Sequence, residues 1–167
     1  MAKKVALIGI VLVIAVGGVF FMMMRRSRMM GAGSQVSAGG LVAVSANGAP
    51  LPAPAAAGKL PENTALQASG DLLVSLSINP YPPSGGGSTD FVVNLTDASG
   101  QPVSDATISL DLTMPEMWMP PNQLNMVAGD AGKYQASGYF TMRGLWRIEV
   151  VITHGGQKQS VFFDVGL

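Results

Sequence analysis

Residues 145–153, LWRIEVVIT, carry apolar side chains at every second position. These positions run from Trp146 to Ile152, and the charged residues Arg147 and Glu149 lie between them. Successive side chains of a β-strand point to opposite faces of a sheet, so one face of this stretch would be buried and the other would meet water. The stretch therefore predicts an antiparallel strand that packs on one side.

The same two-residue period recurs along the chain on both sides of this stretch. Turn-forming residues separate the apolar runs at intervals of about eight to twelve residues, which is typical of all-β domains. Six further strands are predicted, at residues 71–78, 90–96, 105–113, 122–128, 133–140 and 157–165. Seven short strands with one apolar face each predict an all-β, immunoglobulin-like antiparallel β-sandwich with Trp146 in its core. Short turns predict hairpins between strands adjacent in sequence, at residues 97–100, 129–132 and 154–156.

The N-terminal part of the chain has a different composition. Residues 5–24, VALIGIVLVIAVGGVFFMMM, carry no charge, and as a helix they would span about 30 Å, the thickness of a bilayer's hydrocarbon core. This segment accounts for the mean hydropathy of +0.35 and for the charged fraction of only 12%. It predicts a single-pass transmembrane helix in contact with membrane lipid. The alternative is a cleaved signal peptide, whose apolar core would be shorter and would end at small residues rather than at Arg25 and Arg26.

These changes in composition predict three regions. Residues 1–28 form a membrane anchor with basic flanks, residues 29–68 form a flexible linker rich in proline, glycine and alanine, and residues 69–167 form the sandwich. Basic residues flank the anchor on both sides, so charge alone does not assign the side of the membrane. The sandwich carries nine acidic and four basic side chains. This balance argues against a nucleic-acid partner and favours cations or basic protein surfaces.

A loop between two predicted strands holds three methionines. This methionine loop, residues 114–121, has the sequence MPEMWMPP, in a chain with no cysteine and one histidine. Thioether sulfur is a soft, neutral donor that binds without losing a proton, and such donors select Cu(I) among biological metals. The loop therefore predicts a Cu(I) site.

Strand direction reverses at every connection, so alternate connections lie at the same end of a sandwich. Loop 79–88, the methionine loop and the corner at 142–144 would share one end, and this places four candidate metal ligands together: Met114, Met117, Met119 and Met142. Trp118 and Tyr81 are the predicted aromatic neighbours of the site and its docking residues for a partner. His154 lies in a turn at the other end and is excluded from the site.

The same methionines have a second interpretation. Methionine fills irregular gaps at the ends of protein cores, and an exposed Met/Trp loop is typical of a docking surface. The chain would then be a non-metal accessory or interaction subunit of a membrane complex. Under either interpretation no enzyme is expected, because one remote histidine offers no acid–base pair and no nucleophile motif is present.

Three motifs follow one another in the second half of the chain: LDLTMPEM at residues 110–117, GKY at 132–134 and FTMRGLWRIEV at 140–150. Together they resemble the YtkA-like/FixH-like family of membrane-anchored extracytoplasmic domains, over roughly the last hundred residues. The resemblance implies an immunoglobulin-like sandwich, a periplasmic or cell-surface location, and a role in copper handling or in the assembly of haem–copper oxidases. The predicted function is therefore binding of Cu(I) and its delivery to a respiratory membrane complex or another copper-accepting protein.

Overall fold

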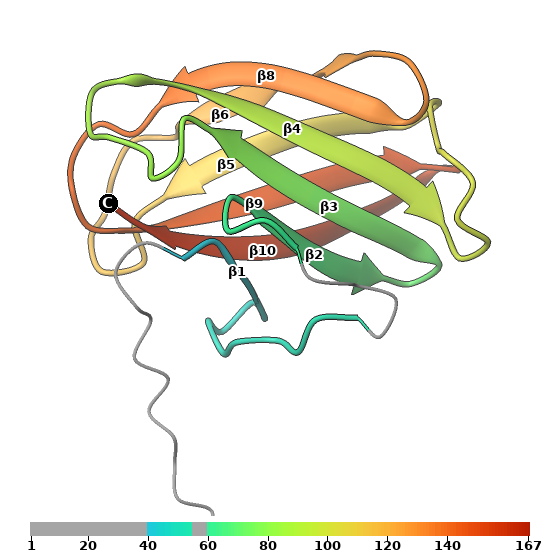
Figure 1. The fold of residues 1–167 in the computed structure, drawn as a ribbon, viewed down its shortest axis with the longest axis horizontal. Coiled ribbons are helices and arrows are strands. Elements are labelled where there is room, and N and C mark those ends of the chain that lie inside the picture. Colours follow the sequence, from blue (N-terminus) through green and yellow to red (C-terminus); the bar gives the residue numbers. More distant parts are fainter. Residues whose placement is uncertain (1–39, 55–59) are drawn as a thin grey trace, which may run out of the picture. The chain divides into compact units, whose positions relative to one another are not determined.

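The computed structural model describes residues 40–54 and 60–167, which contain ten β-strands (Figure 1). The strands are β1 (Val42–Val44), β2 (Thr64–Ser69), β3 (Leu72–Asn79), β4 (Ser88–Asp97), β5 (Thr107–Thr113), β6 (Gln123–Asn125), β7 (Val127–Ala128), β8 (Lys133–Tyr139), β9 (Leu145–His154) and β10 (Gln157–Gly166). The predicted transmembrane segment, residues 5–24, lies outside the described residues. Within them, no helix has the length and hydrophobicity needed to cross a membrane.

The strands form two five-stranded sheets, ordered β1-β10-β9-β5-β6 and β2-β3-β4-β8-β7. Neighbouring strands in both sheets are antiparallel. Figure 1 shows the sheets as two layers. The predicted antiparallel sandwich is therefore confirmed, and the seven predicted strands correspond to the segments from β3 to β10.

The inward side chains of both sheets form one core. The four apolar side chains of β9 that were predicted to be buried have 0% exposure: Trp146, Ile148, Val150 and Ile152. Trp146 lies edge-on to Phe140, with ring centroids 5.3 Å apart, and Phe140 lies edge-on to Phe91 at 5.7 Å. Edge-on pairs of this kind contribute about 0.5–1.5 kcal/mol beyond their buried area. Trp146 thus belongs to the core, as predicted.

Two of the three predicted hairpins are present, β7–β8 and β9–β10. The third prediction, a hairpin at residues 97–100, is wrong, because β4 and β5 lie in different sheets. The turn itself forms: the Asp97 carboxylate accepts hydrogen bonds from the Ser99 amide at 2.8 Å and the Gln101 amide at 2.9 Å. The Ser99 hydroxyl, and then the Gln101 amide, lower the pKa of Asp97. Turn chemistry is therefore satisfied locally, but it does not decide which sheet the next strand joins.

A buried tyrosine holds the crossing from β4 to β5. The Tyr134 hydroxyl donates to the Val103 carbonyl at 3.0 Å and accepts from the Ala106 amide at 3.1 Å. Just before β8, Gly132 has φ of 70°, and an added Cβ would lie 3.0 Å from the Val103 amide nitrogen. The crossing therefore packs closely against β8, with its backbone groups paired by one side chain.

The predicted strand at residues 122–128 is divided between the two sheets. β6 pairs with β5, whereas β7 pairs with β8 in the other sheet. Between them, the Met126 amide donates to the Ile108 carbonyl at 3.0 Å. A segment that switches sheets in this way forms a corner of a sandwich.

The sandwich begins before residue 69. β1 pairs with β10 and β2 pairs with β3, although β1 and all of β2 except Ser69 fall within residues 29–68, the predicted linker. The linker prediction is therefore wrong for these two segments. β1 is only three residues long, and β2 has a single buried residue, so neither strand shows regular alternation. Each pairs with a strand from another part of the chain.

An ion pair on the first sheet secures the segment after β1. Arg147 makes two hydrogen bonds to Asp164, from Nε to Oδ1 and from Nη2 to Oδ2, both at 2.8 Å. Arg147 Nη1 also donates to the Ala46 carbonyl at 3.3 Å. The two side chains are only 17% and 5% exposed, so Arg147 is largely covered rather than facing water as predicted. The hydrogen bonds to Asp164 raise the pKa of Arg147.

Candidate metal centre

Three connections meet at one end of the sandwich, at the left in Figure 1: the β3–β4 loop (80–87), the methionine loop and the β8–β9 corner (140–144). The Gly86 amide donates to the Phe140 carbonyl at 2.6 Å. Gly85 lies against Met142, where an added Cβ would be 3.3 Å from the Met142 carbonyl carbon. The convergence predicted from alternating strand directions is therefore confirmed.

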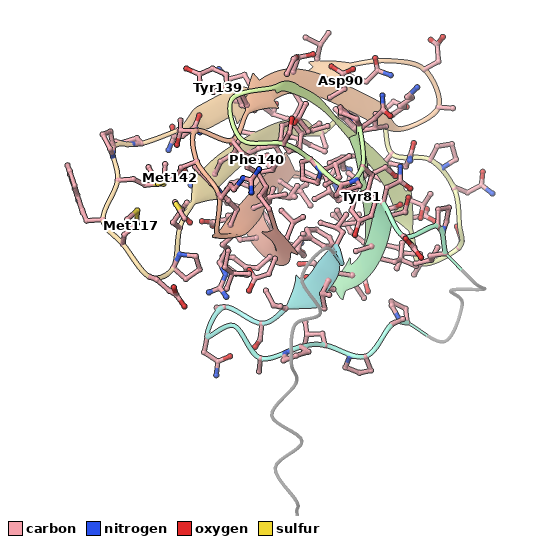
Figure 2. The ribbon with its side chains drawn as sticks, turned by 60° about the vertical axis from the view of Figure 1, so that its left-hand side comes forward. Tyr81, Asp90, Met117, Tyr139, Phe140 and Met142 are labelled. Atoms are coloured by element: carbon pink, nitrogen blue, oxygen red, sulfur yellow. The ribbon has the colours of Figure 1, made fainter. Side chains whose placement is uncertain are left out.

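The four candidate ligands line a single cavity of about 340 Å³: Met114, Met117, Met119 and Met142. Met117 is 48% exposed and Met142 is 45% exposed. Met114 and Met119 are half-buried and pack against the core. Figure 2 shows the labelled Met117 and Met142 side chains at the same end of the molecule. The cavity is thus lined by two exposed and two half-buried methionines.

Contacts with the core hold two of these methionines in place. The Trp146 indole Nε1 donates to the Met142 carbonyl at 3.0 Å, which ties the β8–β9 corner to the centre of the sandwich. Met114 directly follows β5, and its terminal methyl carbon would lie 2.7 Å from a Cβ added at Gly144. Gly144 has φ of 137°, so a larger residue there would strain the backbone and displace Met114. Met142 is therefore held by β9, and Met114 is held by the end of β5.

The two predicted aromatic neighbours differ in position. Trp118 lines the cavity but is 88% exposed, so it stands at the rim and does not cover the methionines. Tyr81 does not line the cavity, and Figure 2 shows it well apart from Met117. The prediction that Tyr81 belongs to this site is wrong. Burial, and then the nearby charge of Glu62, raise the pKa of Tyr81, so this residue lies beside the segment that precedes β2.

Tyr139 is the aromatic residue of this cavity that the sequence analysis missed. It is the last residue of β8, is 58% exposed and lines the cavity with the methionines. Alternation along residues 133–140 assigns it to the outward face, opposite Phe140. Its position three residues before Met142, at the end of a strand that enters the site, was the available signal.

The only histidine lies at the other end of the sandwich, as predicted. His154 ends β9, and its Nε2 lies 3.2 Å from Asp105 Oδ1. β5 begins two residues after Asp105 and ends one residue before Met114, so the length of this strand separates His154 from the methionines. Histidine therefore does not contribute to the candidate site.

The donor set of the cavity fits a soft monovalent ion. Across residues 40–54 and 60–167, no three His, Cys, Asp or Glu side chains come together in a metal-binding group. The cavity offers thioethers, aromatic rings and prolines instead, and its two other lining residues, Asn122 and Thr141, carry no carboxylate. Hard ions such as Ca²⁺ and Mg²⁺ require oxygen ligands, and Zn²⁺ requires imidazole, thiolate or carboxylate. Neutral sulfur ligands suit Cu(I), and the four methionines are the residues that could hold it.

Comparison with known proteins identifies the sandwich. The sequence profile of the YtkA-like family matches residues 66–151, just over half of the chain, and confirms the resemblance drawn from the motifs. No curated protein shows significant similarity to the sequence.

Two solved structures are similar at low identity. A DUF4426 family protein from Pseudomonas aeruginosa PAO1 has a TM-score of 0.46 and 15% identity, over 63% of this chain and 94% of that one. The soluble domain of PmoD from Methylocystis sp. ATCC 49242 (Rockwell) has a TM-score of 0.43 and 13% identity, over 60% and 94%. Neither similarity bears on the chemistry of the site, which follows from the residues of this chain.

Proposed function

Because the chain belongs to the YtkA-like family, we propose that it is a membrane-anchored, extracytoplasmic protein that binds Cu(I) in the methionine cavity and delivers it to a copper-accepting partner. A respiratory haem–copper oxidase under assembly is the partner that the family resemblance suggests. The protein is proposed to act as a carrier and not as an enzyme.

One observation carries this proposal: four thioethers from two separate connections line one cavity. Thioethers are neutral and remain available as ligands at any ordinary pH. They bind Cu(I) less tightly than thiolates, so the metal is released more readily. Because they are neutral, no ligand has to be protonated when the metal leaves. The exposure of Met117 and Met142 gives a partner direct access to the ion, which suits transfer better than storage.

The full-length protein in detergent should bind Cu(I) in competition with a chromogenic chelator. Replacing Met117 and Met119 together by leucine should weaken binding by about 100-fold, since each lost ligand costs about 1.4 kcal/mol, or one factor of ten. Met126→Leu is the matched control, because Met126 is half-buried but does not line the cavity. Absence of binding by the unmodified protein, or equal affinities in all three proteins, would remove the metal from the function.

A second candidate function is docking on a membrane complex without metal. Four of the five exposed large hydrophobic side chains in the described residues line the methionine cavity: Met117, Trp118, Tyr139 and Met142. A second cavity of about 740 Å³ shares Thr141 and Met142 with the first, so a partner segment would have room along this end. Apolar surface that is concentrated in this way favours a protein contact.

If the protein is a docking subunit, Trp118→Ala should strongly reduce its co-purification with a larger membrane assembly. A tryptophan at an interface hot spot contributes about 2 kcal/mol or more, which corresponds to about a 30-fold loss of affinity. The Cu(I) affinity of the same variant should remain within about twofold, because indole is not a ligand of this site. Retained co-purification would contradict docking through the tryptophan.

A further inference from the structure

We propose that Met117 and Met142 are oxidation sites, and that conversion of their thioethers to sulfoxides switches off soft-metal binding at the cavity. The inference rests on the proposed function for its second half only. Its first half, the identity of the oxidised residues, depends on the exposed surface of the side chains alone.

The described residues contain five methionines with two kinds of environment. Met117 and Met142 are 48% and 45% exposed. The other three are half-buried and pack against the core: Met114, Met119 and Met126. An oxidant must reach a sulfur lone pair, so exposed thioethers react before covered ones. The two most exposed methionines therefore line the same cavity, and the three half-buried methionines of the same domain serve as internal references.

The oxidation needs no group other than the oxidant. A sulfur lone pair attacks one oxygen of hydrogen peroxide, the O–O bond breaks, and the second oxygen leaves as water after proton transfer. Sulfur loses two electrons and gains one oxygen, while the peroxide is reduced by two electrons. Hypochlorous acid gives the same product by another path: its chlorine is transferred to sulfur, water then replaces the chlorine, and chloride and one proton are released overall. Conversion of one methionine to its sulfoxide consumes one equivalent of either oxidant.

The product differs from the thioether in the property that matters for the metal. A sulfoxide is polar and chiral, and its oxygen is a hard donor. One sulfur lone pair now forms the S–O bond, and the oxygen withdraws electron density from the lone pair that remains, so a sulfoxide sulfur is a much weaker soft donor. The set of thioether donors therefore falls from four to two. Because both residues are exposed and uncharged before and after reaction, the sandwich should keep its fold.

The residue selectivity is tested first, on metal-free full-length protein in detergent. The protein is treated with hydrogen peroxide, the reaction is stopped at intervals, and peptide mass spectrometry measures the gain of one oxygen at each methionine. Met117 and Met142 should oxidise at least five times faster than Met114, Met119 and Met126. Similar rates at all five positions, or faster reaction at the half-buried ones, would overturn the assignment.

Metal binding is tested next, with Ag(I) as a soft ion that does not itself react with peroxide. Bound Ag(I) should slow oxidation at Met117 and Met142 but not at Met126. The oxidised protein should bind Ag(I) and Cu(I) at least tenfold more weakly than the untreated protein. If the affinity for Ag(I) and Cu(I) is unchanged once Met117 and Met142 are fully oxidised, the proposed switch is wrong.

A variant separates this result from failure of the proposed function. Met117→Leu/Met142→Leu lacks both reactive sulfurs, so its residual affinity should not change on peroxide treatment. If the untreated natural protein binds neither ion, the proposed function and the switch both fall, whereas selective oxidation in metal-free protein would still establish the two sites.

Discussion

Replacing Trp146 by alanine should lower the free energy of unfolding by about 3–5 kcal/mol, the range for removal of a large aromatic side chain from a packed core. Trp146 has 0% exposure and lies edge-on to Phe140. Domains of this size are stable by only about 5–15 kcal/mol, so the variant would lose at least about a fifth of its stability, and nearly all of it if the domain lies at the low end of that range. Chemical denaturation of the full chain in detergent, followed by circular dichroism, measures the change.

The effect of this substitution should extend to the candidate metal centre. The indole Nε1 donates to the Met142 carbonyl at 3.0 Å, so the variant also releases the β8–β9 corner. Trp118→Ala is the matched control: the same side chain is removed where it is 88% exposed, and the change in stability should be within about 0.5 kcal/mol. Equal losses at the two tryptophans would contradict the assignment of Trp146 to the core.

Replacing Asp164 by alanine should cost about 3 kcal/mol, at the lower end of the range for breaking a buried ion pair. The substitution leaves the Arg147 guanidinium largely covered and without its carboxylate partner. Arg147 also holds the Ala46 carbonyl, so the turn after β1 should loosen with the pair. Denaturation should report the loss of stability, and hydrogen exchange should report faster exchange at residues 42–51.

Two further variants test this explanation. Asp105→Ala removes the carboxylate beside His154, where the side chains are 81% and 35% exposed, and it should cost less than about 0.5 kcal/mol. The double variant Arg147→Met/Asp164→Leu removes both charges and should be more stable than Asp164→Ala alone. If the double variant is less stable than the single one, the cost does not come from an uncompensated charge.

The strands with regular alternation were predictable from the sequence because each places one apolar face on the shared core. That burial appears in the sequence as an apolar residue at every second position. β9 is the clearest example, since each of its inward residues is apolar and fully buried. β1 and β2 could not be identified in this way. β1 is three residues long and exists through its pairing with β10, about 120 positions further along the chain. A local pattern contains no information about such a partner.

The candidate site was predictable to the extent that strand direction determines it. The alternation of strand directions alone predicted that Met142 lies beside the methionine loop, and both line the same cavity. Tyr81 was misplaced because the position of a side chain within a long loop depends on what the loop packs against. Here that surface includes the segment before β2, which the sequence assigned to a linker. Tyr139 was missed because alternation assigns it to the outward face, and only its position just before the β8–β9 corner indicated that it would lie beside Met142.

The outer strands of the two sheets have a consequence for the behaviour of the protein at high concentration. Unpaired backbone groups along a sheet margin recruit strands from other molecules, and natural proteins often limit this by keeping such strands short. Three of the four outer strands are very short: β1 and β6 have three residues each and β7 has two, and Pro50 lies beside β1. The fourth, β2, has six residues and is the longest free margin of the described residues. Strand pairing between molecules at high concentration should therefore take place at β2 rather than at the other three margins.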